Sequence, residues 1–188
     1  MRRSTVGRSL RMSAPVLLLA ALSVLAPVAA RGDSMYLRID GIEGQVTAAG
    51  YVNQIAVQSW TWGASNPVTV GSATGGLTAG KVSMSELAIM KSADSSTPRL
   101  VEYASAAKHA PKAVLSMIRS TDGFLYLRIT LEDVMVSSLQ LSAADERPSE
   151  SVSLSFARVG IEYWAGPGKP RVASGWDVVK NMPFTPAP

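Results

Sequence analysis

The chain has 188 residues, no cysteine, 18 lysine and arginine residues against 14 aspartates and glutamates, and a formal net charge of +4. Four of the basic residues and none of the acids lie in the first 30 positions, so the remaining 158 residues carry fourteen of each sign. That balance of charge offers no basic face to a nucleic acid. The absence of cysteine excludes a lipid-modified lipoprotein. A length of 158 residues suffices for one domain without disulfides or a metal.

The first 30 residues have the three parts of a secretory signal. Arginines precede an uncharged apolar run at 14–27, and small residues follow it. Val28 and Ala30 occupy the positions that a signal peptidase recognises before its cleavage site. Prolines and a serine interrupt the run, which favours a cleaved signal over a membrane-spanning helix of about 20 apolar residues. We expect cleavage after Ala30, one mature domain at 31–188, and export to the periplasm or the medium. The alternative is a translation start near Met35, with the domain first in the cytoplasm and then secreted.

Alternation of apolar and polar residues with period two predicts a mainly β domain after the signal. The longest strands are expected at 124–132, with apolar residues at 125, 127, 129 and 131 on one face, and at 151–164. In the second strand the apolar positions change from even-numbered to odd-numbered residues between Phe156 and Val159. This change predicts a bulge or bend near Ala157–Arg158. Shorter strands are predicted at 35–41, 54–62, 81–90, 112–120, 134–142 and 175–181, and turn residues separate several of them.

One segment has helical spacing instead. A helix is predicted at about 98–109, with Thr97 as its N-cap and proline at its first position. Lys108 and His109 lie near its C-terminus, where cations suit the helix dipole, and Pro111 ends it.

A run of 37 residues, from Gly44 to Gly80, contains no charged side chain. One interpretation is a strand followed by a flexible, glycine-containing loop. The other is a surface that contacts another protein, because the cores of interfaces are depleted of charge. We expect the second, with Trp62, Val68, Val70 and Leu77 as the candidate contact residues.

Signals for catalysis are weak. Ser105 and Lys108 form an S-x-x-K pair that could hold a nucleophilic serine beside a lysine, but no second motif supports a hydrolase. His109 is the only histidine and has no triad context, and no phosphate-binding loop or metal-spaced cluster is present. We therefore expect no catalytic residue, no cofactor and no metal.

Six stretches in order carry a family resemblance: "MYLRIDGIEGQV", "IAVQSWTWG", "GKVSMSELAIMKSADSSTPRLVEYASAAKH", "YLRITLEDVMVSS", "ESVSLSFARVGIEY" and "GWDVVKN". The mature chain resembles the haemolysin-coregulated protein (Hcp) family, the tube subunit of type VI secretion, from about Met35 to Asn181. The resemblance implies an antiparallel two-sheet β-barrel with one flanking helix. It also implies hexameric rings that stack into a tube and carry effector proteins, and no catalytic residue.

One feature departs from the family, because tube subunits do not usually carry a cleavable signal. The chain is thus expected to be a ring-forming structural protein, in a tube or as an exported relative, with the region from Trp62 to Gly80 between subunits. The alternative is a secreted β-barrel binding module without a role in a tube. A nucleic-acid partner and a stable membrane span are not expected.

Overall fold

A computed structural model describes residues 32–70, 77–144 and 147–186. The signal region and Ala30 therefore lie outside the described residues. One helix, α1 (Thr97–Ser105), accompanies the strands. The strands of the first half are β1 (Ser34–Ile39), β2 (Ile55–Val57), β3 (Ser59–Thr61), β4 (Ala64–Ser65), β5 (Val68–Val70), β6 (Leu77–Ala79), β7 (Ser83–Met84) and β8 (Leu87–Ser92). Those of the second half are β9 (His109–Ile118), β10 (Leu125–Ser142), β11 (Ser149–Trp164), β12 (Arg171–Asp177) and β13 (Met182–Phe184).

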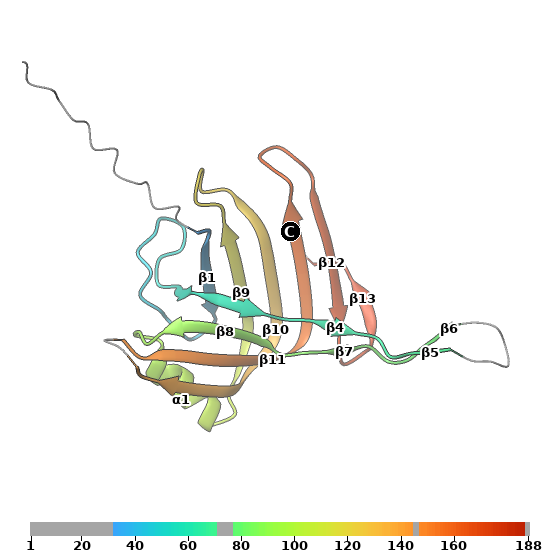
Figure 1. Cartoon of the computed structure of the whole chain (residues 1–188), viewed down its shortest axis with the longest axis horizontal. Coiled ribbons are helices and arrows are strands. Elements are labelled where there is room, and N and C mark those ends of the chain that lie inside the picture. The colour runs from blue at the N-terminus through green and yellow to red at the C-terminus, as the bar shows by residue number, and fades with distance from the viewer. Residues whose placement is uncertain (1–31, 71–76, 145–146, 187–188) are drawn as a thin grey trace, which may run out of the picture. The chain divides into compact units, whose positions relative to one another are not determined.

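Nine strands form one antiparallel sheet in the order β13-β12-β11-β10-β9-β1-β2, with β8 pairing both β11 and β3 (Figure 1). The segment 55–61 connects the β2 edge of this sheet to β8, the branch strand that pairs with β11. Its residues 55–57 pair with β1, and its residues 59–61 pair with β8. The sheet thus wraps around the core in a barrel-like manner. The expectation of a mainly β, antiparallel fold with one helix is confirmed.

The two longest strands, β10 and β11, bend together. Val152 and Leu154 are buried before the bend, and Val159 is buried after it, so the predicted change of parity near 157–158 is confirmed. The register is the same on both sides of the bend, which excludes an extra residue in one strand at this point. Asp133 of β10 has a positive φ of 53°, and this conformation turns the following side chains of β10 to the other face.

The start of β10 corrects one prediction. Leu127, Ile129 and Leu131 face the core as expected. Leu125 does not, because the pairing with β9 shifts by one residue between Leu125 and Leu127. A bulge of this kind moves the preceding side chain to the opposite face, where Leu125 lines the same cavity as Arg128.

Helix α1 is shorter than the predicted 98–109, and its cap differs. Ser96 is the N-cap, whereas the hydroxyl of Thr97 accepts a hydrogen bond from the backbone N–H of Asp94 at 3.1 Å. The helix ends at Ser105, and His109 is already the first residue of β9. A turn with Ala107 at a positive φ of 49° replaces the last predicted turn of the helix. The helical spacing of small residues in the sequence continues past this point, so it predicted a helix that was too long.

The core consists of aliphatic side chains from both halves of the bent sheet and from α1, among them Leu37, Ile55, Leu87, Leu115, Ile129 and Leu154, each at most 1% exposed. A charged cluster is buried beside them. The Lys91 ammonium lies 2.5 Å from Oε2 of Glu150 and 2.9 Å from Oδ1 of Asp94, and Lys91 and Glu150 are fully buried. No helix in the described part of the chain is long and apolar enough to cross a membrane.

Candidate functional site

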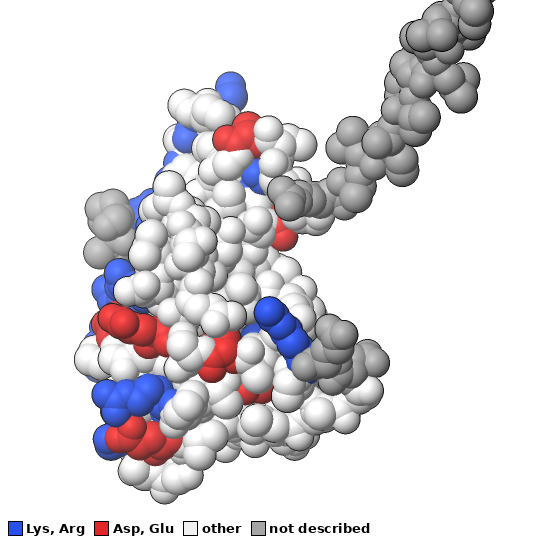
Figure 2. Space-filling view, turned by 90° about the vertical axis from the view of Figure 1, so that its left-hand side faces the viewer, with Lys and Arg blue, Asp and Glu red and all other residues white. Residues whose placement is uncertain are grey.

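The uncharged stretch begins as an exposed surface next to the edge of the sheet. The loop between β1 and β2 exposes four uncharged residues, Gln45, Thr47, Ala49 and Val52, and Val52 is 60% accessible. Figure 2 views the molecule from the side on which β1 and this loop lie in Figure 1. It shows a broad area without charged residues, with acidic and basic side chains gathered in clusters beside it.

The second part of the stretch belongs to a hairpin arm, which we define as residues 64–84 and which ends beyond the stretch with Lys81 and β7. Strand β4 pairs with β7, and β5 pairs with β6 beyond them, each as a separate two-stranded sheet. Figure 1 shows the arm extending away from the nine-stranded sheet. Within the described residues of the arm, positions 64–65, 68–70, 77–79 and 83–84 are paired strands rather than an irregular loop.

The four candidate contact residues separate into two places. Val68, Val70 and Leu77 meet in the β5–β6 hairpin, where Val70 pairs with Leu77. Val68 is 55% exposed, and the side chains of Val70 and Leu77 lie outside the described part of the structure. Trp62 is at the base of the arm instead, where its ring packs partly against the core. Its indole Nε1 is buried and has no hydrogen-bond partner among the described residues.

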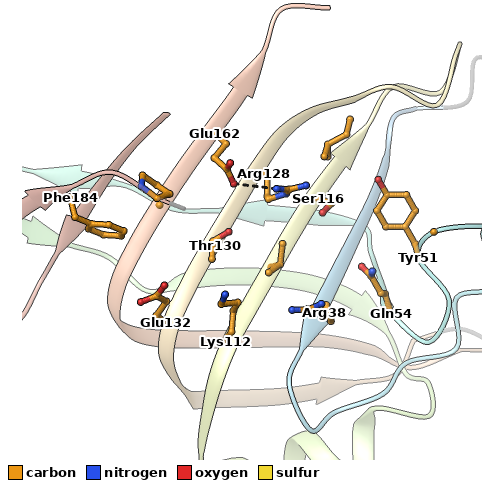
Figure 3. Close-up of a pocket in the computed structure, with 15 residues that line it drawn as sticks. Arg38, Tyr51, Gln54, Lys112, Ser116, Arg128, Thr130, Glu132, Glu162 and Phe184 are labelled. Atoms are coloured by element: carbon orange, nitrogen blue, oxygen red, sulfur yellow. Dashed lines mark hydrogen bonds and ion pairs between the residues drawn. The ribbon is translucent and has the colours of Figure 1, made fainter. Parts of the chain in front are cut away.

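Sequence reasoning did not find a polar cavity of about 390 Å³ on the face of the sheet opposite the core. Figure 3 shows its side chains rising from neighbouring strands, with the loop before β2 on one side and the C-terminal segment on the other. Residues opposite one another in the ladder line it: Gly160 faces Thr130, Thr130 faces Val114, and Val114 faces Arg38. The polar residues that alternate along β10 at 128, 130 and 132 had indicated this polar face. They did not indicate which neighbouring strands complete the cavity.

The carboxylates of this cavity are already neutralised by arginines. Glu162 is buried between Arg128, 3.5 Å away, and Arg171, which donates a hydrogen bond to it. Glu132 forms an ion pair with Arg158, in which the closest nitrogen and oxygen are 2.8 Å apart. Both carboxylates are therefore held in ion pairs with arginines of the same chain.

The C-terminal segment forms one wall of the cavity over two glycines. Gly160 and Gly175 pair directly across β11 and β12. A Cβ atom on Gly160 would lie 2.6 Å from Cγ of Pro186, and one on Gly175 would lie 2.8 Å from the ring of Phe184. Only residues without a side chain allow this segment to lie so close to the sheet.

The residues considered for catalysis do not form a site. The Lys108 ammonium forms an ion pair with Glu102 and lies 5.7 Å from the centroid of the Tyr103 ring, and no described hydrogen bond joins it to Ser105. His109 Nδ1 lies 2.5 Å from Oδ1 of Asp133 on the exposed surface. Among the residues that the structure describes, no group of three or more acidic or histidine side chains is arranged to hold a metal ion.

The fold, the arm and the paired polar face together define a structural β protein. A family model described as "Type VI secretion system effector, Hcp" matches residues 36–163. Protein hcp1 of Pseudomonas aeruginosa is 38% identical over 113 residues, which cover 54% of this chain and 68% of that protein. The chain belongs to the Hcp family of type VI secretion, and it is a structural protein of the secretion tube.

Solved structures agree with this membership. The crystal structure of Hcp1 from Salmonella typhimurium matches with a TM-score of 0.72 and 29% identity, over 82% of this chain and 100% of that one. A structure titled "Structure of a type six secretion system protein" matches with a TM-score of 0.75 and 27% identity, over 81% and 100%. Proteins of this family assemble with themselves into rings and are secreted through the type VI apparatus.

Proposed function

We propose that residues 31–188 form a hexameric ring that stacks into a tube and accompanies effector proteins out of the cell. The observation that carries the proposal is the outer hairpin of the arm, β5–β6, which has no charged side chain and exposes Val68 at 55%. A closed ring needs a heterologous interface, in which one patch of a subunit meets a different patch of the next. The outer hairpin is suited to such a contact because it carries no charged side chain that an interface would bury.

The test introduces charge into the arm. Aspartate at both Val68 and Val70 is expected to prevent assembly and to leave the barrel folded, because an unpaired charge buried in an interface costs several kcal/mol. Native mass spectrometry would follow the ring, and circular dichroism would follow the fold. Val101→Asp is the matched control, since Val101 is 42% exposed on α1. A double variant that still forms rings of wild-type affinity would show that the arm is a solvated connection.

We also propose that the chain is exported by a signal cleaved after Ala30. Residues just upstream of Met35 take part in the fold, which supports a start before that methionine. Asp33 accepts a hydrogen bond from the backbone N–H of Ser120 at 3.2 Å. Burial raises the pKa of Tyr126, and the hydrogen bond from Tyr126 to Asp33 raises it further.

N-terminal sequencing of the protein produced from its own gene tests the signal. A chain that begins at Arg31 outside the cytoplasm is expected. A cytoplasmic chain that begins at Met1 or at Met35 would contradict the export proposal while leaving the ring proposal intact. A monomer that co-purifies with a different protein would instead favour the secreted binding module.

We further propose that the mature protein has no catalytic activity of its own. The lysine of the S-x-x-K pair, Lys108, is engaged by Glu102 rather than by Ser105. Ser105→Ala is expected to leave every activity of the purified protein unchanged. Hydrolysis that is lost in this variant, with circular dichroism unaltered, would overturn the proposal.

A further inference from the structure

The polar cavity on the face of the sheet opposite the core contains a cation without a counterion. Lys112 of β9 is half-buried and lies directly opposite Glu132 of β10 in the ladder. Glu132 is held by Arg158 instead, with 2.8 Å between the closest nitrogen and oxygen. Among the described residues, no ion pair or hydrogen bond engages the Lys112 ammonium. A half-buried charge is favourable only beside an opposite charge, and here the described part of the chain does not supply one.

The other cations of this face are matched by carboxylates, but one match is weak. Arg38 lies 3.5 Å from Asp40, and both side chains are exposed, at 54% and 39%, so the pair contributes little. Arg38 projects from β1, the strand beside β9, and lines the same cavity as Lys112. The ion pairs of this face together with Lys112 comprise five basic side chains, Arg38, Lys112, Arg128, Arg158 and Arg171, and four acidic ones, Asp40, Glu132, Glu162 and Asp177. One positive charge is therefore in excess.

An amide beside these cations is also unsatisfied. Gln54 lines the cavity one residue before β2, and its side-chain Oε1 is buried without a hydrogen-bond partner among the described residues. The backbone holds this residue in place. The N–H of Gln54 donates to the carbonyl of Tyr51 at 3.1 Å, and its carbonyl accepts from the N–H of Val46 at 3.0 Å. A buried acceptor fixed in this way is unfavourable until a donor reaches it.

The cavity has room for a ligand between these groups. Its volume of about 390 Å³ lies within the range of about 300–1,000 Å³ that small-molecule sites occupy. Figure 3 shows Gln54, Arg38 and Lys112 along one side of the cavity, and Phe184 at its other end. Neighbouring strands are about 4.8 Å apart, so a group the size of one amino acid can contact side chains from two of them at once.

We propose that this cavity binds the C-terminal residue of a peptide. The terminal carboxylate lies between Lys112 and Arg38, and the amide N–H of the same residue donates to Oε1 of Gln54. The ligand thereby neutralises the excess charge and supplies the missing donor. An uncharged peptide segment offers the N–H without the carboxylate, and a simple anion offers the charge without the N–H. The loop before β2 and the C-terminal segment stand on two sides of the cavity, so an entering chain ends there rather than passes through.

Isothermal titration calorimetry of the full chain tests this assignment with three probes: N-acetyl-trialanine, its C-terminal amide and acetate. The tripeptide acid is expected to bind, and the amide and acetate to bind about tenfold more weakly or worse, because each lacks one of the two contacts. Lys112→Met should lower the affinity for the acid about tenfold or more, and Gln54→Leu about fivefold, as charged and neutral hydrogen bonds differ. Lys112→Arg should retain binding. Lys108→Met, a lysine on the surface after α1, is the matched control and should change nothing.

Several results would overturn the proposal, provided that circular dichroism shows each variant to be folded. Equal affinity for the acid and the amide would remove the role of the carboxylate, and equal affinity for the acid and acetate would remove that of Gln54. An undiminished affinity in Lys112→Met, or no binding at millimolar peptide, would place no such site in this cavity. Binding that appears only after residues 187–188 are deleted would mean that the chain's own end occupies it. None of these results bears on the ring proposal, because every lining residue belongs to one subunit.

Discussion

Replacing Lys91 by methionine should destabilise the domain more than any surface substitution. Lys91 is fully buried, and its ammonium is the cation that compensates both Glu150, at 2.5 Å, and Asp94, at 2.9 Å. Methionine fills a similar volume but leaves two carboxylates without their cation. Removing one partner of a buried ion pair costs about 3–5 kcal/mol.

The other contacts of the two carboxylates cannot compensate for the loss of the Lys91 charge. The hydroxyl of Thr97 donates to Glu150 at 2.5 Å, and Ser96 donates to Asp94 from its backbone N–H at 2.9 Å. These hydrogen bonds hold the carboxylates in place but do not neutralise them. At about 2–4 °C per kcal/mol for a domain of this size, Lys91→Met should lower the melting temperature by roughly 6–20 °C.

The assay is urea unfolding followed by circular dichroism, with Lys108→Met as the control. Lys108 also forms an ion pair, but it lies on the surface, so its replacement should leave the midpoint nearly unchanged. The double variant Lys91→Met with Glu150→Leu should regain part of the stability, because it removes one buried anion together with the cation. A loss below about 1 kcal/mol in Lys91→Met would refute the argument that this cation compensates the buried acids.

Gly175→Ala should destabilise the domain by about 1–3 kcal/mol in urea unfolding, because its Cβ would lie 2.8 Å from the ring of Phe184. Gly63→Ala, whose Cβ would meet only Ser85 Oγ at 3.9 Å, should show no such loss. The hydrogen bond from Ser155 to Glu86 holds the pKa of Glu86 below its ordinary value of 4.5, so this stability is present above that pH and is lost on acidification. Ser155→Ala should raise the pKa of Glu86, measured by NMR titration. It should also reduce the part of the acid-induced destabilisation that comes from Glu86. An unchanged Glu86 pKa would contradict this prediction.

The fold was predictable where the sequence alternates and where it resembles the family. Leu127, Ile129 and Leu131 indicated their own buried face, and the parity change before Val159 indicated the bend in β11. The matching bend in β10 has a similar signal, because its apolar positions change from odd to even numbers between Leu131 and Val134, but the pattern was interpreted as two strands, 124–132 and 134–142. The bend depends on the positive φ of Asp133, a backbone conformation that a single side chain does not specify.

The candidate site was only partly predictable, for two physical reasons. The absence of charge identified the arm as a surface, but its short strands lack the alternation that would have indicated paired hairpins. The polar cavity is assembled from residues between Arg38 and Pro186, and only strand order and register bring them together. Gly160 and Gly175 gave the one local clue, since glycine within a strand indicates a close approach by another part of the chain.

The distribution of charge decides which surfaces can meet in an assembly. On the polar face, Glu162 and Glu132 are already paired with arginines of the same chain, so covering this face would cost desolvation of these pairs. The outer hairpin of the arm, β5–β6, has no charge to desolvate. Val68 on this hairpin and the paired residues Tyr163 and Val172 expose apolar side chains to water. Self-association should therefore cover the uncharged surfaces and leave the polar face solvated. Its arginine–carboxylate pairs, formed within one subunit, do not depend on the neighbours and would remain intact whenever rings assemble or come apart.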